Sequence, residues 1–150
     1  MSLHTGTHAD APFHFQSTGF SPAEVDLAPY VGPALVIDLT GIDVIEPRHL
    51  APLKDGEVER LLIKTQSTDT DKFTGDVAQL SADSGKWTDR FAHLSADAAQ
   101  MIAGRGVKLV GLDTPSVDHA DSKTLDAHKI LAAGSVAILE NLVLAHVVPG

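Results

Sequence analysis

Near its start the chain reads HTGTHADAPFH (residues 4–14), a stretch that holds three of the eight histidines and one aspartate. The side chains here that can bind a metal are separated by four, two and four residues; they are His4, His8, Asp10 and His14. Side chains on an extended backbone alternate between its two faces, so even spacings place all four on one side. Glycine, proline and β-branched threonines within the stretch disfavour a helix. We therefore predict an extended ribbon over residues 4–14.

The chemistry of these four side chains favours a metal site. Neutral imidazole and carboxylate are good ligands for Zn²⁺, Mn²⁺ and Fe²⁺. Two or three histidines with one carboxylate would leave a coordination position open for water, as catalytic sites require. The alternative is a surface loop that is simply polar. Four ligand-type side chains on one face of the ribbon make the metal site the better interpretation.

Composition limits the classes of protein to which the chain can belong. Its 150 residues are 43% hydrophobic, which suits one globular domain with a substantial core. The absence of cysteine excludes disulfides and thiolate metal sites, and with it we expect a cytoplasmic protein. The net charge of −9, without a basic cluster, argues against a nucleic-acid partner. No apolar run approaches the ~20 residues that a membrane crossing needs, so we expect no membrane partner.

The apolar runs farther along the chain alternate between strand and helix patterns. Short β-branched runs predict strands over residues 34–39, 60–65, 107–112 and 136–139. Ser95 has the N-cap position of a helix that ends at Gly104 or Gly106, and Ser122 or Thr124 begins another that ends at Gly134. This alternation predicts a mixed α/β domain.

Several polar residues lie beside these elements. His128 by itself is typical of a helix surface. Asp113, after a predicted strand, would either shape a pocket or cap the turn that follows, and the cap is the better interpretation from the residues alone. Glu140 follows an apolar run, where it would be either exposed at the strand end or buried against a cation such as a metal.

Three parts of the sequence resemble the metal-dependent cyclase family, which includes bacterial kynurenine formamidases (arylformamidases) and isatin hydrolases. HTGTHADAPFHF resembles its signature His-x-Gly-Thr-His-x-Asp-x-Pro-x-His. GLDTPSVDHADSKTLDAHKILAAGSVAILENL (residues 111–142) is similar to its distal block, in which a histidine in a helix precedes a glutamate in a strand. The piece from Trp87 to Phe91 looks more like the formamidase branch. The likeness spans nearly the whole chain.

The resemblance implies a fold and a site. The fold would be a swivelling β/β/α-type domain with a central barrel-like sheet, one domain over residues 1–150 that is shortened at both termini. His4, His8 and Asp10 would bind one metal, and Asp10 would bridge to a second metal bound by His128 and Glu140. His14 would donate and accept protons. The resemblance implies two Zn²⁺ ions per chain, with Mn²⁺ as the alternative.

The resemblance also implies an activity. We expect a metal-dependent amidohydrolase of aryl formamides, which converts the small molecule N-formyl-L-kynurenine to L-kynurenine and formate in tryptophan catabolism. One alternative is a related hydrolase that opens cyclic amides, as isatin hydrolases do. Another is a shortened, non-catalytic metal-binding protein. A serine hydrolase is disfavoured because the chain has no Gly-x-Ser-x-Gly motif. We expect a homodimer and assign no substrate-binding residues.

Overall fold

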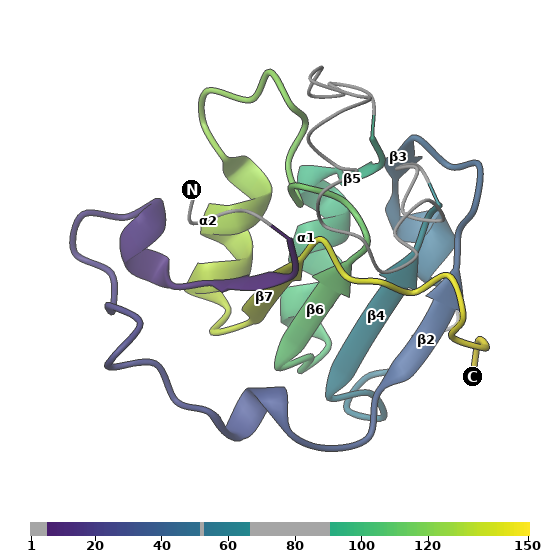
Figure 1. Ribbon diagram of the computed structural model, residues 1–150, viewed down its shortest axis with the longest axis horizontal. Coiled ribbons are helices and arrows are strands. Elements are labelled where there is room, and N and C mark those ends of the chain that lie inside the picture. Colours follow the sequence, from purple (N-terminus) through teal and green to yellow (C-terminus); the bar gives the residue numbers. More distant parts are fainter. Residues whose placement is uncertain (1–5, 52, 67–90) are drawn as a thin grey trace.

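The computed structural model of the protein describes residues 6–51, 53–66 and 91–150. Five strands form its main sheet (Figure 1). Their order across the sheet is β1 (His8–Asp10), β7 (Ala137–Glu140), β6 (Leu109–Leu112), β4 (Arg60–Lys64) and β2 (Leu35–Asp38). Strand β1 is antiparallel to β7, and the other neighbouring strands are parallel. A second pair, β3 (Val44–Ile45) and β5 (His93–Leu94), is also parallel.

The central strand β6 is apolar, and both of its faces are covered. All four residues of β6 are buried, as expected for a parallel strand with a layer on each side. Gly111 in β6 lies close against the segment after β7, since a Cβ there would lie 2.5 Å from the Leu142 side chain. The segment after β7 can therefore pack closely over β6. This packing fixes the chain just beyond Glu140.

Two helices cover one face of the sheet (Figure 1). Helix α1 spans Ala96–Gly104, and the Ser95 hydroxyl accepts a hydrogen bond of 3.1 Å from the Ala98 amide, which confirms Ser95 as the N-cap. Helix α2 spans Asp126–Ala133 and packs against α1. Their buried side chains join the sheet residues in one hydrophobic core. Short 3₁₀ helices η1 (Pro12–His14), η2 (Ala28–Tyr30) and η3 (Pro47–Leu50) lie in the connections.

The chain after β7 crosses the carboxyl ends of the strands (Figure 1). Its backbone amide at Leu142 donates to the Leu112 carbonyl at the end of β6. Lys64 at the end of β4 donates from Nζ to the Ala145 carbonyl at 3.0 Å. At β2, Val36 and Gly150 exchange two backbone hydrogen bonds. The first two contacts hold residues 142–145 along the carboxyl ends of the strands, and Gly150 lies beside β2, at the opposite side of the sheet from β1.

The structure confirms the mixed α/β fold with a central sheet and corrects two local predictions. The extended ribbon is wrong beyond β1, because residues 12–14 form η1. Pro12 explains this difference, since its fixed φ and missing N–H suit the first position of a helix. Helix α2 begins at Asp126 rather than at Ser122 or Thr124, because Leu125 has a left-handed backbone with φ of 52°.

Across the described ranges, neither α1 nor α2 nor any other helix combines the length and the apolar character that a membrane crossing demands.

Helix α2 should contribute to the free energy of unfolding mainly through the side chains that it packs into the core. Leu131 is fully buried, so Leu131→Ala should lower the free energy of unfolding by ~2–5 kcal/mol through lost burial and a cavity. Lys129 is exposed on the same helix, so Lys129→Ala is the matched control. This substitution should change the free energy of unfolding by less than ~0.5 kcal/mol. Urea unfolding followed by circular dichroism measures both. Equal stabilities of the two variants would contradict the assigned core.

Candidate metal centre

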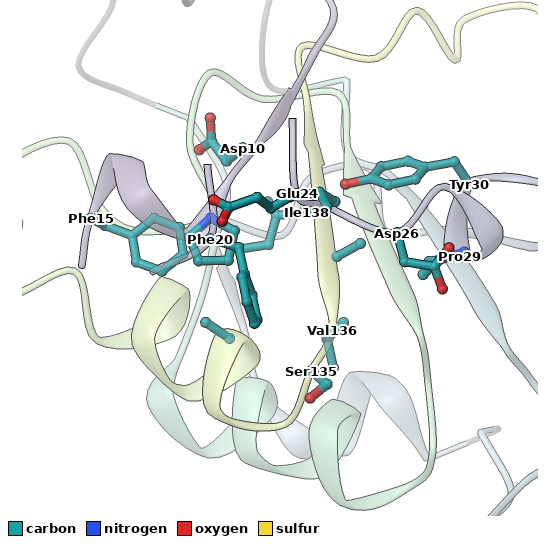
Figure 2. Close-up of a pocket in the computed structure, with 14 residues that line it drawn as sticks. Asp10, Phe15, Phe20, Glu24, Asp26, Pro29, Tyr30, Ser135, Val136 and Ile138 are labelled. Carbon is teal, nitrogen blue, oxygen red and sulfur yellow. The ribbon is translucent and has the colours of Figure 1, made fainter. Parts of the chain in front are cut away.

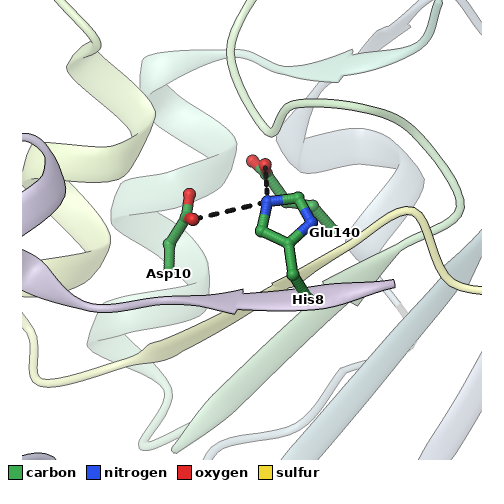
Figure 3. A group of neighbouring side chains, drawn as sticks. All are labelled: His8, Asp10 and Glu140. Carbon is green, nitrogen blue, oxygen red and sulfur yellow. Dashed lines mark ion pairs between the residues drawn. The ribbon is translucent and has the colours of Figure 1, made fainter. Parts of the chain in front are cut away.

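The pairing of β1 with β7 builds the first part of the site. The antiparallel register places His8 directly opposite Glu140. Asp10 lies two residues after His8 in β1, so both side chains project from the same face of the strand. His8 Nε2 lies 3.5 Å from Asp10 Oδ1 and 3.4 Å from Glu140 Oε2 (Figure 3). Strand pairing alone thus brings one imidazole and two carboxylates together.

Helix α2 adds His128 to this group. His128 Nε2 lies 3.2 Å from Asp10 Oδ2 and 3.3 Å from Glu140 Oε1. Each of the two carboxylates therefore directs one oxygen to His8 and the other to His128. The two acids lie between the two imidazoles, and the group comes from three elements that are far apart in the sequence.

Burial and close contact shift the pKa values of the side chains in this group. Asp10 is 6% exposed, Glu140 2% and His128 3%. Burial raises the pKa of Asp10, but its hydrogen bond to His128 and the charges of His128, His14 and His8 outweigh burial and lower that pKa. Burial lowers the pKa of His128, while its hydrogen bonds to Asp10, Asp118 and Glu140 raise it to about 11. The acids thus strongly stabilise a positive charge between them.

The same features suit a divalent ion. His8, Asp10 and Glu140 each offer a ligand atom within 4.8 Å of the others. Imidazole nitrogen and carboxylate oxygen match the preferences of Zn²⁺ and Mn²⁺. Carboxylates that stabilise the His128 cation would equally stabilise a metal cation, whose charge is larger. The residues present therefore fit a metal centre.

Backbone and side-chain groups around the centre hold the candidate metal ligands in place. The Val117 amide donates to Glu140 Oε1 at 2.8 Å. His8 Nδ1 lies 2.9 Å from the Gly6 carbonyl oxygen. His128 Nδ1 lies 2.7 Å from Asp118 Oδ2, and the ring of Phe15 packs on the His128 imidazole at a centroid distance of 5.0 Å. Asp118 and Val117 could not be identified from the sequence, because no spacing rule connects a loop residue to a histidine in the following helix.

His14 lies outside the cluster of donors. It is exposed at the end of η1, and its charge is one of those that lower the pKa of Asp10. Its imidazole therefore lies within electrostatic reach of the centre without belonging to the buried group. His4, a predicted ligand, and residues 87–90, which carry part of the family resemblance, lie outside the described residues.

A cavity of about 280 Å³ lies beside the centre. The segment 12–30 forms one wall, with Phe15, Phe20 and Tyr30, and β7 with the end of α2 forms the other (Figure 2). Asp10 lies at its edge. Burial raises the pKa of the Tyr30 phenol, and the negative charge of Asp10 raises it further. The cavity thus lies close to the group of carboxylates, and its lining is mainly apolar.

The structure therefore gathers His8, Asp10, His128 and Glu140 from the predicted set. The surface interpretation of His128 is wrong, because α2 directs its imidazole inward. Exposure of Glu140 at a strand end is also wrong, since Glu140 is the buried last residue of β7.

Known proteins are similar to this chain in sequence and in fold. A kynurenine formamidase from Bacillus cytotoxicus is 41% identical over 151 aligned residues, covering 100% of this chain and 66% of that protein. The chain thus spans slightly less than two thirds of the length of the curated relatives it matches. A solved structure of a potential metal-dependent hydrolase with cyclase activity superposes with a TM-score of 0.80 at 29% identity, covering 100% of this chain and 68% of that one.

An isatin hydrolase A from Labrenzia aggregata has a TM-score of 0.69 at 23% identity, covering 99% of this chain and 64% of that one, a likeness that concerns the fold alone. The model of the Cyclase family matches residues 1–119, which include His8 and Asp10, and its match ends before His128 and Glu140. The match covers well over half of the sequence. The chain belongs to the Cyclase family.

Proposed function

We propose that the protein hydrolyses aryl formamides, with N-formyl-L-kynurenine as substrate and L-kynurenine and formate as products. The observation that carries this proposal is the buried group of two imidazoles and two carboxylates, in a chain 41% identical to a kynurenine formamidase. Opening of a cyclic amide has weaker support, because the likeness to isatin hydrolases lies below 25% identity.

We propose two divalent ions, Zn²⁺ or alternatively Mn²⁺, in the centre. His4, His8 and Asp10 would hold one ion, and Asp10, His128 and Glu140 the other. The opposite oxygens that Asp10 directs to His8 and His128 support its bridging role. The chemistry that such ions supply is polarisation of the amide carbonyl and a lowered pKa of water.

The residues of the chain would do the remaining work. We propose that the His14 imidazole accepts a proton from water as the oxygen attacks the formyl carbon, and then donates it to the aryl nitrogen as the C–N bond breaks. Exposure at the edge of the centre lets His14 exchange protons with solvent. The Phe15 ring, tilted against the His128 imidazole, covers one side of that ligand.

The larger architecture belongs to the same proposal. We propose one domain over residues 1–150 of the swivelling β/β/α type. Within the described residues the sheet is open between β1 and β2, so the barrel-like closure stays a prediction. A homodimer is supported by four large exposed apolar side chains along residues 13–31, a segment suited to contact another subunit: Phe13, Phe20, Leu27 and Val31.

Metal content and turnover on one sample test the proposal directly. Protein purified without chelator should contain about two zinc ions per chain by elemental analysis and should hydrolyse N-formyl-L-kynurenine. His8→Ala should reduce both metal content and turnover, because His8 faces both carboxylates. His146→Ala, at an exposed histidine outside the centre, is the matched control. Full activity of the His8→Ala protein would sink the proposal, and metal without turnover would identify a non-catalytic binder.

Substitution of His14 separates proton transfer from metal binding. His14→Gln should lower kcat by ~10²–10⁴-fold, the usual contribution of general acid–base catalysis, because the imidazole proton is lost. Its metal content should equal that of the unmodified protein, since His14 lies outside the buried group. Loss of metal together with activity would instead assign His14 to the ligands.

Metal affinity should depend on pH through His128. Its pKa of about 11 means that the metal-free imidazole carries a proton near neutrality, which must leave when a metal binds. Rising pH weakens this competition, so zinc affinity should increase between pH 6 and 8, by up to ~10-fold per unit for each proton released. Calorimetric titrations in buffers of different ionisation enthalpy count these protons. An affinity independent of pH would show that His128 releases no proton.

A further inference from the structure

We propose that Asp118 is a positioning residue, which sets the tautomer and the direction of the His128 imidazole at the candidate metal centre. The inference rests on the proposed metal site and is independent of the substrate. Asp118 Oδ2 lies 2.7 Å from His128 Nδ1, and Asp118 is 5% exposed. The contact is thus short and shielded from water.

The contact determines which ring nitrogen can bind a metal. A carboxylate only accepts hydrogen bonds, so in a metal-loaded centre, where Nε2 would face the ion, a neutral His128 carries its proton on Nδ1 toward Asp118. Nε2 then presents its lone pair, and this is the atom that lies 3.2 Å from Asp10 and 3.3 Å from Glu140. A carboxylate behind a ligand histidine orients the ring and increases its basicity. Asp118 occupies that position.

The same carboxylate also fixes the start of α2. The backbone amide of Ala127 donates to Asp118 Oδ1 at 2.9 Å, and that of His128 donates to Oδ2 at 3.1 Å. Leu125, the N-cap residue, provides no side-chain cap, so Asp118 satisfies these amides from outside the helix. The helix backbone and the His128 ring are consequently held by one group.

The loop that carries Asp118 is anchored on both sides. Buried Val117 accepts a hydrogen bond of 2.8 Å from the Leu94 amide, and its own amide donates to Glu140. The Asp118 amide donates to Ser116 Oγ at 3.1 Å. Adjacent residues of one loop therefore hold both His128 and Glu140. This rigidity allows Asp118 to set a direction rather than follow the ring.

The substitution Asp118→Asn separates positioning from a purely structural cap. The introduced side chain would have nearly the same size but one amide donor in place of an acceptor. Turned toward His128, the amide would force the proton onto Nε2 and block metal binding. Turned toward the helix, it would meet the Ala127 amide, another donor. Asp126→Asn is the matched control, because exposed Asp126 lies in the first turn of α2 and its replacement removes the same charge.

The test is zinc affinity, measured by competition with a chromophoric chelator, together with the thermal unfolding midpoint. Asp118→Asn should bind zinc ~10–100-fold more weakly than the unmodified protein, whereas Asp126→Asn should bind it equally well. Unchanged affinity in Asp118→Asn would overturn the inference. An equal loss in both variants would also overturn it, since the cause would then be helix charge.

If Asp118→Asn fails to fold, a measurement on the unmodified protein still tests the inference. In the zinc-loaded protein, ¹⁵N chemical shifts should show a protonated Nδ1 and a metal-bound Nε2 at His128; the reverse assignment would overturn the inference. Zinc binding without hydrolysis would defeat the proposed activity, while Asp118 would still be tested by affinity. A protein that binds no zinc at all would overturn both.

Discussion

The pairing of β1 with β7 is the constraint on which the candidate site depends. The strands are short, and their register alone decides whether His8 faces Glu140. A shift by one residue would turn every side chain of β1 to the opposite face and would separate His8 and Asp10 from the other donors. The bond from the Thr7 hydroxyl to the Asn141 carbonyl, at 2.6 Å, adds a contact just beyond the paired residues and supports this register.

The buried acids impose the next requirement. Burial of carboxylates is costly unless a cation or several hydrogen bonds compensate for lost water. The protein meets this cost with imidazoles, with the Val117 amide and with the amides at the start of α2. Each buried carboxylate is thus held by hydrogen bonds from neighbouring imidazole or amide groups. This explains why so many residues of the loop before α2 are engaged with the site.

The sequence predicted the parts that depend on local pattern. Apolar β-branched runs located β2, β4, β6 and β7, and Ser95 located the start of α1. Even spacing correctly placed His8 and Asp10 on one face, but it could not foresee that Pro12 would start a 3₁₀ helix, which ends the strand alternation before His14.

Contacts between segments that are far apart in the sequence could not be predicted from local pattern. Burial of His128 and Glu140 followed from the family resemblance and not from periodicity. Asp113 shows the same limit: its carboxylate accepts hydrogen bonds from Thr65 and Gln66 at the end of β4, a neighbour that only the sheet order reveals. Asp118 is a further example, since its partners lie in the next helix.

The edge position of β1 has a mechanical consequence. Within the described sheet, β1 has β7 as its neighbour, so few backbone bonds hold it. An ion shared by β1, β7 and α2 would act as a cross-link between an early and a late segment of the sequence. Because the ion would bind only when these three elements are assembled, its binding would stabilise the assembled arrangement by mass action. Metal occupancy would then govern whether this outer strand detaches before the rest of the sheet, and so tie local unfolding to the supply of the ion.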